Sequence, residues 1–255
     1  MTAALAGRRW LIRDPDPDAP ARLLCLPVSG LGAALFRHWP TRVGEIDVCP
    51  VQLPGRENRM REPAYTSMDA FAAGGADALE PLLDRPYAFF GHCLGARMSY
   101  ALTREIAARG RRLPERLFVS SCLAPHRGGR FGGGPSGPFT PETTDEEYFA
   151  ELRLGCRLRD EPEPPDELLA LSVRVLRPDI ELTCAYVPPP PVGPADPALR
   201  ITTIGWSADP HVRPEQMGEW TRYGAVDPIV LEGDEYTYRQ GGDDLLEVIA
   251  EGFPT

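Results

Sequence analysis

The sequence predicts an α/β fold in which a mainly parallel sheet is covered by helices on both faces. Short apolar segments typical of buried strands alternate along most of the chain with segments whose apolar residues recur at helical spacing. A Gly-x-Cys-x-Gly turn at residues 91–95 lies directly between one such strand and one such helix. In sheets of this kind functional residues gather at the carboxyl ends of the strands, where three candidates fall: Cys93, Asp209 and Glu235.

In the first half of the chain we expect strands at residues 22–26, 47–53, 87–90 and 116–121, and an edge strand at 10–13. Ser67 is a suitable helix cap, because its hydroxyl accepts a hydrogen bond from a free N–H of the first turn. The helix that it begins, residues 68–83, has an apolar stripe made of Met68, Phe71, Gly75, Leu79 and Leu82. The helix after the cysteine extends from Leu94 to about Arg109.

The second half begins with a change of pattern, because strand and helix stop alternating between residues 140 and 187. Two helical segments follow one another there, bounded by a glycine-rich segment at 127–138 and by prolines at 188–191. We interpret residues 140–191 as a helical lid inserted into a core of residues 1–139 and 192–255; two ordinary packing helices are the alternative. Strands at 199–204 and 227–231 and helices at 214–223 and 242–252 complete the core.

The turn around Cys93 is typical of a nucleophile elbow. The reactive side chain of such an elbow sits on a strained strand-to-helix turn, where only glycine fits on both flanks. The helix then directs free N–H groups and the positive end of its dipole at the sulfur of Cys93, which stabilises a thiolate or the oxyanion of an attacked thioester. A buried cysteine between two turn glycines is the plainer interpretation.

Two further positions are candidates for supporting roles. Ser29 belongs to the glycine-bearing loop 27–32 that follows the first core strand, where a backbone N–H can be turned towards a ligand; an ordinary strand-to-helix turn is the alternative. Arg97 lies one turn beyond Cys93. It is either a surface arginine or a cation that lowers the pKa of the thiol, and we also take it as a candidate substrate contact.

Composition excludes several classes of function. The formal net charge of −10 and the pI near 5.0 leave no basic excess for a nucleic-acid partner. A run of about 18 apolar residues does not occur, so we expect a cytoplasmic protein without membrane partners. The six cysteines form no CxxC pairs and are not interleaved with histidines, which predicts neither a metal site nor a disulfide framework. At 255 residues we expect one catalytic unit.

With these features in place, the chain resembles the type II thioesterases, alpha/beta-hydrolases that serve polyketide and nonribosomal peptide synthetases. The resemblance covers nearly the whole length and rests on motifs in a specific order: Leu24-Cys25-Leu26-Pro27 with Ser29-Gly30, residues 36–39, 51–57, Arg85-Pro86, the elbow at 91–95, residues 124–126, the helical lid and Asp209-Pro210.

The resemblance implies an alpha/beta-hydrolase fold with a lid, and a site without a cofactor. It implies that the backbone amides of Ser29 and Leu94 form an oxyanion hole, and that Asp209 is the acid of a triad of nucleophile, acid and histidine. The implied substrates are acyl thioesters, either small molecules or acyl groups on the phosphopantetheine arm of an acyl or peptidyl carrier protein.

Three departures from the family pattern change the expected chemistry. Cys93 replaces the usual elbow serine, and Glu235 replaces the triad histidine in the loop after the last core strand. Trp206 replaces a glycine three residues before Asp209, which narrows the expected pocket and makes it a candidate substrate contact. None of the four histidines occupies the triad position, although a substitute role for His92, His126 or His211 stays open.

The two catalytic replacements together favour transfer over hydrolysis. A thiol, with a reference pKa of about 8.5, needs much less help from a base than a serine hydroxyl does. Water needs a base that works near neutral pH, and a carboxylate with a reference pKa of about 4.3 is poor at this unless burial raises its pKa. An incoming thiol is already partly ionised and exchanges one thioester for another. An ionised Glu235 would also repel a thiolate, so either Glu235 is protonated or Cys93 is mostly thiol.

Three functional hypotheses therefore stand side by side. The first is acyl transfer through Cys93 on carrier-bound thioesters, either from carrier to carrier or as a specialised hydrolysis. The second is acid or base chemistry by Glu235 on a natural product, for example a cyclisation, and the third is a catalytically inactive carrier-binding module. Arg109, Arg111 and Arg112 are a candidate basic patch for an acidic carrier, with solvated surface arginines as the alternative.

Overall fold

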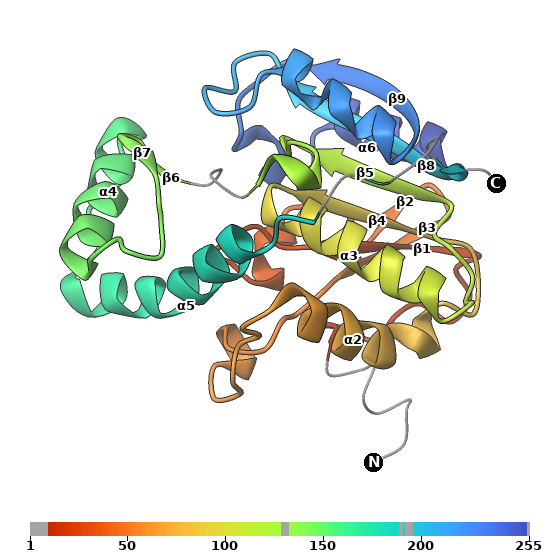
Figure 1. The fold of residues 1–255 in the computed structure, drawn as a ribbon, viewed down its shortest axis with the longest axis horizontal. Helices are drawn as coiled ribbons and strands as arrows, with labels where there is room; N and C mark the ends of the chain where they lie inside the picture. Colours follow the sequence, from red (N-terminus) through yellow and green to blue (C-terminus); the bar gives the residue numbers. More distant parts are fainter. Residues whose placement is uncertain (1–9, 129–132, 189–190, 192–195, 254–255) are drawn as a thin grey trace.

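The computed structural model describes residues 10–128, 133–188, 191 and 196–253 (Figure 1). Its centre is a seven-stranded sheet in the order β2-β3-β1-β4-β5-β8-β9. The strands are β1 (Ala21–Leu26), β2 (Arg42–Val43), β3 (Ile46–Pro50), β4 (Tyr87–His92), β5 (Arg116–Ser120), β8 (Asp196–Trp206) and β9 (Gly224–Leu231). Among the described strands of this central sheet only the pair β2–β3 is antiparallel, which confirms the predicted mainly parallel sheet.

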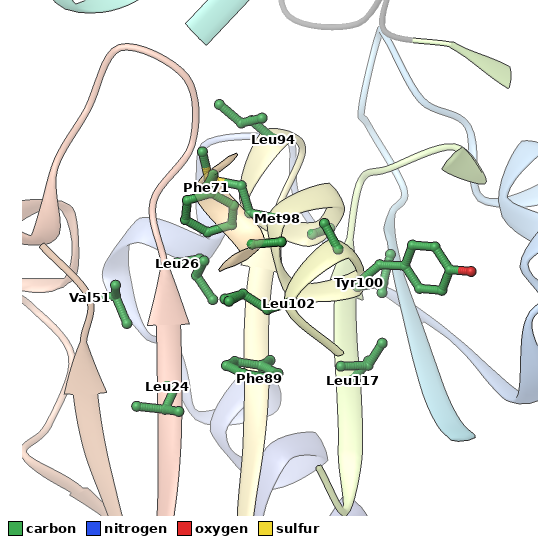
Figure 2. Packing of buried hydrophobic residues seen from close by; sticks show 14 of the residues in the cluster. Leu24, Leu26, Val51, Phe71, Phe89, Leu94, Met98, Tyr100, Leu102 and Leu117 are labelled. Carbon is green, nitrogen blue, oxygen red and sulfur yellow. The ribbon is translucent and has the colours of Figure 1, made fainter. Parts of the chain in front are cut away.

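Alternate residues of the central strands face two separate hydrophobic layers. Leu24 of β1 and Phe89 of β4 belong to the layer under α2 (Met68–Leu79) and α3 (Leu94–Ala108), part of which Figure 2 shows. Leu23 and Phe90, one residue away in each strand, belong to the opposite layer, with residues of η1 (Ala33–Phe36), η6 (Thr237–Gln240) and α6 (Asp243–Gly252). Strands buried on both faces explain the continuous apolar runs of the sequence.

The predicted helices form with small changes at their ends. Ser67 caps α2 by accepting a hydrogen bond from the Ala70 N–H. The predicted apolar stripe is buried throughout, but its last residue, Leu82, lies beyond α2 in the short 3-10 helix η3 (Glu80–Leu82). The segment predicted as a helix at 214–223 is instead the 3-10 helix η5 (Pro214–Arg222). Further 3-10 turns are η2 (Glu57–Arg59) and η4 (Pro125–Arg127).

The edge strand predicted at residues 10–13 is wrong. Only Leu11 pairs there, through an isolated antiparallel bridge to Val51, which lies just beyond the end of β3. Pro15 and Pro17 follow closely, and a proline has no N–H to donate to a neighbouring strand. The strand predicted at 47–53 is correspondingly shorter and ends at Pro50.

Two helices stand beside the core as a separate layer (Figure 1). They are α4 (Asp145–Leu158), which begins with a capping box of Thr144 and Glu147, and α5 (Asp166–Ala185). A small hydrophobic cluster holds them together, formed by Phe139, Tyr148, Val173, Leu176 and Ile180. The hairpin β6 (Gly133–Gly134) and β7 (Gly137–Pro138) packs on α4, where Glu151 accepts a hydrogen bond from the Ser136 N–H. Parts of the predicted glycine- and proline-rich hinges, 129–132 and 189–190, lie outside the described residues.

Candidate active site

Cys93 occupies a strained elbow between β4 and α3. Its φ of 52° and ψ of −113° lie where side chains are rarely found, and the helix begins at the next residue. A Cβ added at Gly91 would stand 2.2 Å from the carbonyl carbon of Gly95, and one added at Gly95 would stand 2.4 Å from the carbonyl oxygen of Leu26. Both flanking glycines are therefore required, as the nucleophile-elbow interpretation predicts.

A cavity of about 320 Å³ opens above this elbow and brings the predicted residues together. Cys93, Asp209 and Glu235 all line it, together with Ser29. The layer of α4, α5 and the β6–β7 hairpin, which we call the lid layer, supplies much of the remaining wall, through Pro135, Phe139, Leu152, Gly155, Ser172 and Leu176 among others. The site is thus assembled at the carboxyl ends of β1, β4, β8 and β9 and is bounded by α4 and α5.

The surroundings of Cys93 favour the neutral thiol. Burial raises the pKa of the Cys93 thiol to about 11, against a hydrogen bond from the Leu94 N–H and the charge of Arg97, which both lower it. The nearby carboxylate of Asp209 adds to the rise. The helix terminus therefore acts on the sulfur as expected, but desolvation outweighs its effect on the pKa.

Asp209 is held rigidly by the backbone that follows it. Its Oδ1 accepts hydrogen bonds from the N–H groups of His211 at 2.7 Å and Val212 at 2.9 Å. The other oxygen, Oδ2, is buried and has no hydrogen-bond partner among the described residues. A buried acceptor without a donor is costly, and a triad histidine is the kind of donor that would satisfy it.

Glu235 is largely buried, with its side chain 16% exposed. Burial is the main reason why the pKa of its carboxyl is raised, and the carboxylates of Asp209 and Asp234 raise it further, while its own backbone N–H and His211 oppose the shift. His211 Nε2 lies 3.6 Å from Glu235 Oε1, and the His211 side chain lines the same cavity. The position of His211 two residues after Asp209 was the only signal for this pairing in the sequence.

The expected oxyanion donors lie beside the sulfur and at the cavity wall. The Leu94 N–H hydrogen-bonds the sulfur of Cys93, and Ser29 lines the cavity. Asp179 of α5 accepts a hydrogen bond from the Gly30 N–H at 2.8 Å, next to Ser29. The loop that carries Ser29 is thereby tied to the lid layer.

The loop at residues 54–59, for which the sequence offers no explanation, holds this same segment from the other side. Arg56 forms a bidentate ion pair with Asp179, with both N···O distances 2.8 Å and both side chains at least 95% buried, and donates to the Leu31 carbonyl at 2.9 Å. Gln52, which precedes this loop, accepts from the Ala33 N–H at 2.8 Å. This clamp joins three segments that are distant in the sequence.

The positions of Arg97 and Trp206 do not support the predicted substrate contacts, because neither side chain lines the cavity. Arg97 is buried, and its terminal nitrogens donate to three carbonyl oxygens, those of Gly128, Pro125 and Tyr186. A buried guanidinium requires such acceptors, so Arg97 is also not the surface arginine of the alternative interpretation. Trp206 is buried too, and its Nε1 donates to Ser120 Oγ at 3.0 Å.

His92, His126 and the three arginines of the predicted basic patch are held by contacts within the protein. His92 is stacked on Tyr238, and burial lowers its pKa to about 3, which keeps the imidazole neutral. His126 is hydrogen-bonded to Tyr223 Oη at 2.8 Å and does not line the cavity. The predicted basic patch is neutralised by neighbouring acids, since Arg109, Arg111 and Arg112 pair with Asp77, Glu105, Glu80 and Glu115.

The described part of the chain contains neither a candidate metal cluster nor a helix that could span a membrane. Among the described residues, histidine, cysteine and acidic side chains form no group of three or more that would hold a metal ion. Within the same residues, every helix is too short or too polar to cross a bilayer.

Comparison with known proteins identifies the family. Residues 21–251 match the model of the thioesterase domain. The chain is 32% identical over 251 residues to the protein named linear gramicidin dehydrogenase LgrE of Brevibacillus parabrevis, covering 94% of this chain and 91% of that protein. It is 33% identical to the thioesterase RedJ of the prodiginine pathway of Streptomyces coelicolor, with a TM-score of 0.77 over 95% of this chain and 94% of that one.

The type II thioesterase YbtT of the yersiniabactin pathway is also similar, at 26% identity and a TM-score of 0.78 over 96% of this chain and 97% of that chain. Both structures align with nearly the whole chain, and the family match includes all seven strands of the central sheet together with α4 and α5. The protein therefore belongs to the thioesterase-domain family, and its fold is the alpha/beta-hydrolase fold.

Proposed function

We propose that this protein transfers acyl groups between carrier-bound thiols of a natural-product pathway through a covalent thioester on Cys93. The observation that carries the proposal is a single cavity lined by Cys93, which sits on a nucleophile elbow, and by Asp209 and Glu235. The resemblance to the family implies a histidine at the position of Glu235. The similarity to RedJ and YbtT, whose titles name biosynthetic pathways, supports a carrier-bound acyl substrate.

The reaction consists of two thioester exchanges that follow the same steps. The sulfur of Cys93 bonds to the carbonyl carbon of the acyl group, and the bond from that carbon to the carrier sulfur breaks. The proton of the Cys93 thiol passes to the released carrier thiolate. The second exchange runs the same steps in reverse with another carrier thiol, so one thioester replaces another at little cost in free energy. Backbone N–H groups of Leu94 and Ser29 are the proposed donors to the oxyanion of each step.

Hydrolysis is the weaker outcome, because the site lacks the usual base for water. Asp209 Oδ2 has no donor among the described residues, so no imidazole in this part of the chain is oriented by this aspartate to activate water. His211, beside Glu235, is the only imidazole of the described residues that lines the cavity apart from the neutral, buried His92. An incoming thiol needs less activation than water does.

A second candidate function is favoured by Glu235 itself. A largely buried carboxyl with a raised pKa, beside His211, is a candidate proton donor or acceptor. Acid or base chemistry on a tethered natural product would then leave Cys93 without a covalent role. The inactive carrier-binding module is favoured by no feature of the cavity.

Intact-protein mass spectrometry tests the proposal. The protein is mixed with an acyl-loaded carrier protein, and Cys93→Ala is treated in the same way. We expect a mass gain equal to the acyl group that is absent in Cys93→Ala and is removed faster by a second carrier's thiol than by water. Product formation that survives Cys93→Ala and is lost in Glu235→Gln would instead establish the second candidate.

A further inference from the structure

Two arginines stand where the active-site cavity meets a neighbouring cavity of about 360 Å³. Arg159, at the C-terminal end of α4, and Arg239, in η6, line both cavities, as does Tyr236. The guanidinium carbons of Arg159 and Arg239 lie 5.1 Å and 4.6 Å from the centre of the Tyr236 ring. The lid layer and the core thus each place one cation against the same aromatic ring.

Among the described residues, Arg239 differs from the buried arginines in the partners of its guanidinium. Arg22, Arg56 and Arg116 each pair with an aspartate, and Arg97 donates to carbonyl oxygens. Arg159 pairs with Glu161 at 2.8 Å. Arg239 is half-buried, contacts the rings of Tyr236 and Tyr238, and has no carboxylate of the described residues at ion-pair distance. A guanidinium at a cavity wall without a carboxylate partner is suited to bind an external oxyanion.

The carboxylates around the two cavities are already engaged by donors of the chain. Glu151 accepts from the Ser136 N–H, Glu57 from the Ala34 N–H, and Glu161 from Arg159. Asp209 accepts from two backbone N–H groups, and Glu235 lies beside His211. Arg37 and His38 add basic side chains to the neighbouring cavity. Among the described residues, none of these carboxylates is thus at ion-pair distance from Arg239, whose guanidinium is left to an anion of the substrate.

We propose that Arg239, with Arg159 beside it, is a binding site for an oxyanion of the substrate. This inference rests on the proposed function, since it assumes an acyl thioester in the cavity. The oxyanion is either the phosphodiester of a phosphopantetheine arm or a carboxylate at the far end of the acyl group. Both match the forked donors of a guanidinium, and the experiment distinguishes them.

Binding is measured by calorimetry on Cys93→Ala, so that no acyl transfer is needed. Three ligands are compared: S-acetyl-pantetheine, which is neutral, S-acetyl-phosphopantetheine and S-succinyl-pantetheine. We expect Arg239→Gln to weaken the binding of one anionic ligand by about 10- to 100-fold and to change the neutral ligand by less than about twofold. Arg239→Lys retains part of the affinity. Arg111→Gln, which removes a distant surface charge, leaves all three unchanged.

Loss confined to the phospho ligand assigns the site to the arm, and loss confined to the succinyl ligand assigns it to the acyl group. An equal loss for all three ligands overturns the proposal, because Arg239 then acts only on the structure. Unchanged binding in Arg239→Gln overturns it, and so does the absence of any preference for an anionic ligand in the protein with Arg239.

Arginine modification by phenylglyoxal gives a second measurement that needs no variant to fold. We expect the preferred anionic ligand to protect Arg239 but not Arg111, as read by peptide mass spectrometry, and equal modification with and without ligand overturns the proposal.

The proposed acyl transfer and the proposed anion site can also fail separately. Anion binding to Cys93→Ala without any acyl-Cys93 in the parent protein removes the transfer function alone. Acylation of Cys93 that is equally efficient after Arg239→Gln removes the subsite alone.

Discussion

At the scale of single residues, desolvation acts in the same direction on two groups that line the cavity. It raises the pKa of the Cys93 thiol to about 11, and it also raises the pKa of the Glu235 carboxyl. The sequence predicts either a protonated Glu235 or a Cys93 that is mostly thiol, and the shift of Cys93 favours the thiol. The proton of Cys93 therefore has to leave when the sulfur attacks a bound thioester.

The Cys93 shift predicts an unusual pH profile for alkylation. At pH 7 only roughly one molecule in ten thousand carries the thiolate when the pKa is about 11, so iodoacetamide labelling of Cys93 should be slow and rise steadily up to pH 10. Peptide mass spectrometry separates Cys93 from the other cysteines, and Cys93→Ala is the control. A plateau of the labelling rate below pH 8 would show that the helix terminus overcomes desolvation.

The raised pKa of Glu235 predicts that a neutral side chain at this position stabilises the protein at high pH. Its folded-state pKa is raised, so its contribution to stability is full below the pKa of the unfolded chain and is lost as the pH rises through the folded pKa. Glu235→Gln should therefore raise the melting temperature at pH 8, and the difference should vanish towards pH 4. Glu247→Gln, on the exposed side of α6, should show no such trend. A lower melting temperature for Glu235→Gln at pH 8 would contradict the assignment.

At the scale of elements, the lid helix α5 and the loop that carries Ser29 are joined by the clamp of Arg56 and Asp179. Their ion pair bridges positions 123 residues apart and is almost fully buried, with side chains 5% and 3% exposed. A buried pair costs desolvation when formed, but the loss of one partner leaves an uncompensated charge in the core.

Asp179→Asn should consequently lower the free energy of unfolding by about 3–5 kcal/mol, as measured by urea denaturation. Replacement of both partners, Arg56→Met with Asp179→Leu, should cost less than Asp179→Asn alone. The surface pair of Arg109 and Asp77 provides the matched control, and Asp77→Asn there should cost less than about 1 kcal/mol. Equal effects at the two sites would mean that the clamp is not an important contact.

At the scale of the whole molecule, the net charge of −10 is distributed so that the surface arginines near the end of α3 are already neutralised. These arginines are therefore not free to attract an acidic carrier, and Arg239 at the cavity junction is proposed to bind an oxyanion of the substrate instead. Screened surface pairs contribute little to binding.

A variant with Arg111→Gln and Arg112→Gln should therefore leave kcat/KM for an acyl-loaded carrier within about twofold of the parent value. The measurement is the rate of acyl-Cys93 formation at two carrier concentrations and at low salt, where surface charges act most strongly. A loss of tenfold or more would restore these arginines as the carrier patch.

The sequence by itself determined the elbow, because its causes are local. The strand ending at His92, the two glycines and the apolar stripe of α3 all lie between residues 87 and 106, and each restricts its neighbours. The alternation of strands and helices likewise predicted the parallel sheet and placed Cys93, Asp209 and Glu235 at one edge of it. Alternation does not report pairing partners, which is why the edge strand at 10–13 was wrong.

Only the tertiary structure decided which charges are buried and what each one faces. Arg97 was predicted as a surface group, a substrate contact or a cation that lowers the thiol pKa. It is enclosed by carbonyl oxygens of residues 125–128 and of Tyr186, and of these predictions only the effect on the pKa of Cys93 agrees with its position. The neighbours of His211 and Arg56, which are Glu235 and Asp179, come from loops and helices far away in the chain. Burial and long-range pairing set pKa values and ligand contacts, and these depend on packing between segments that no local sequence pattern records.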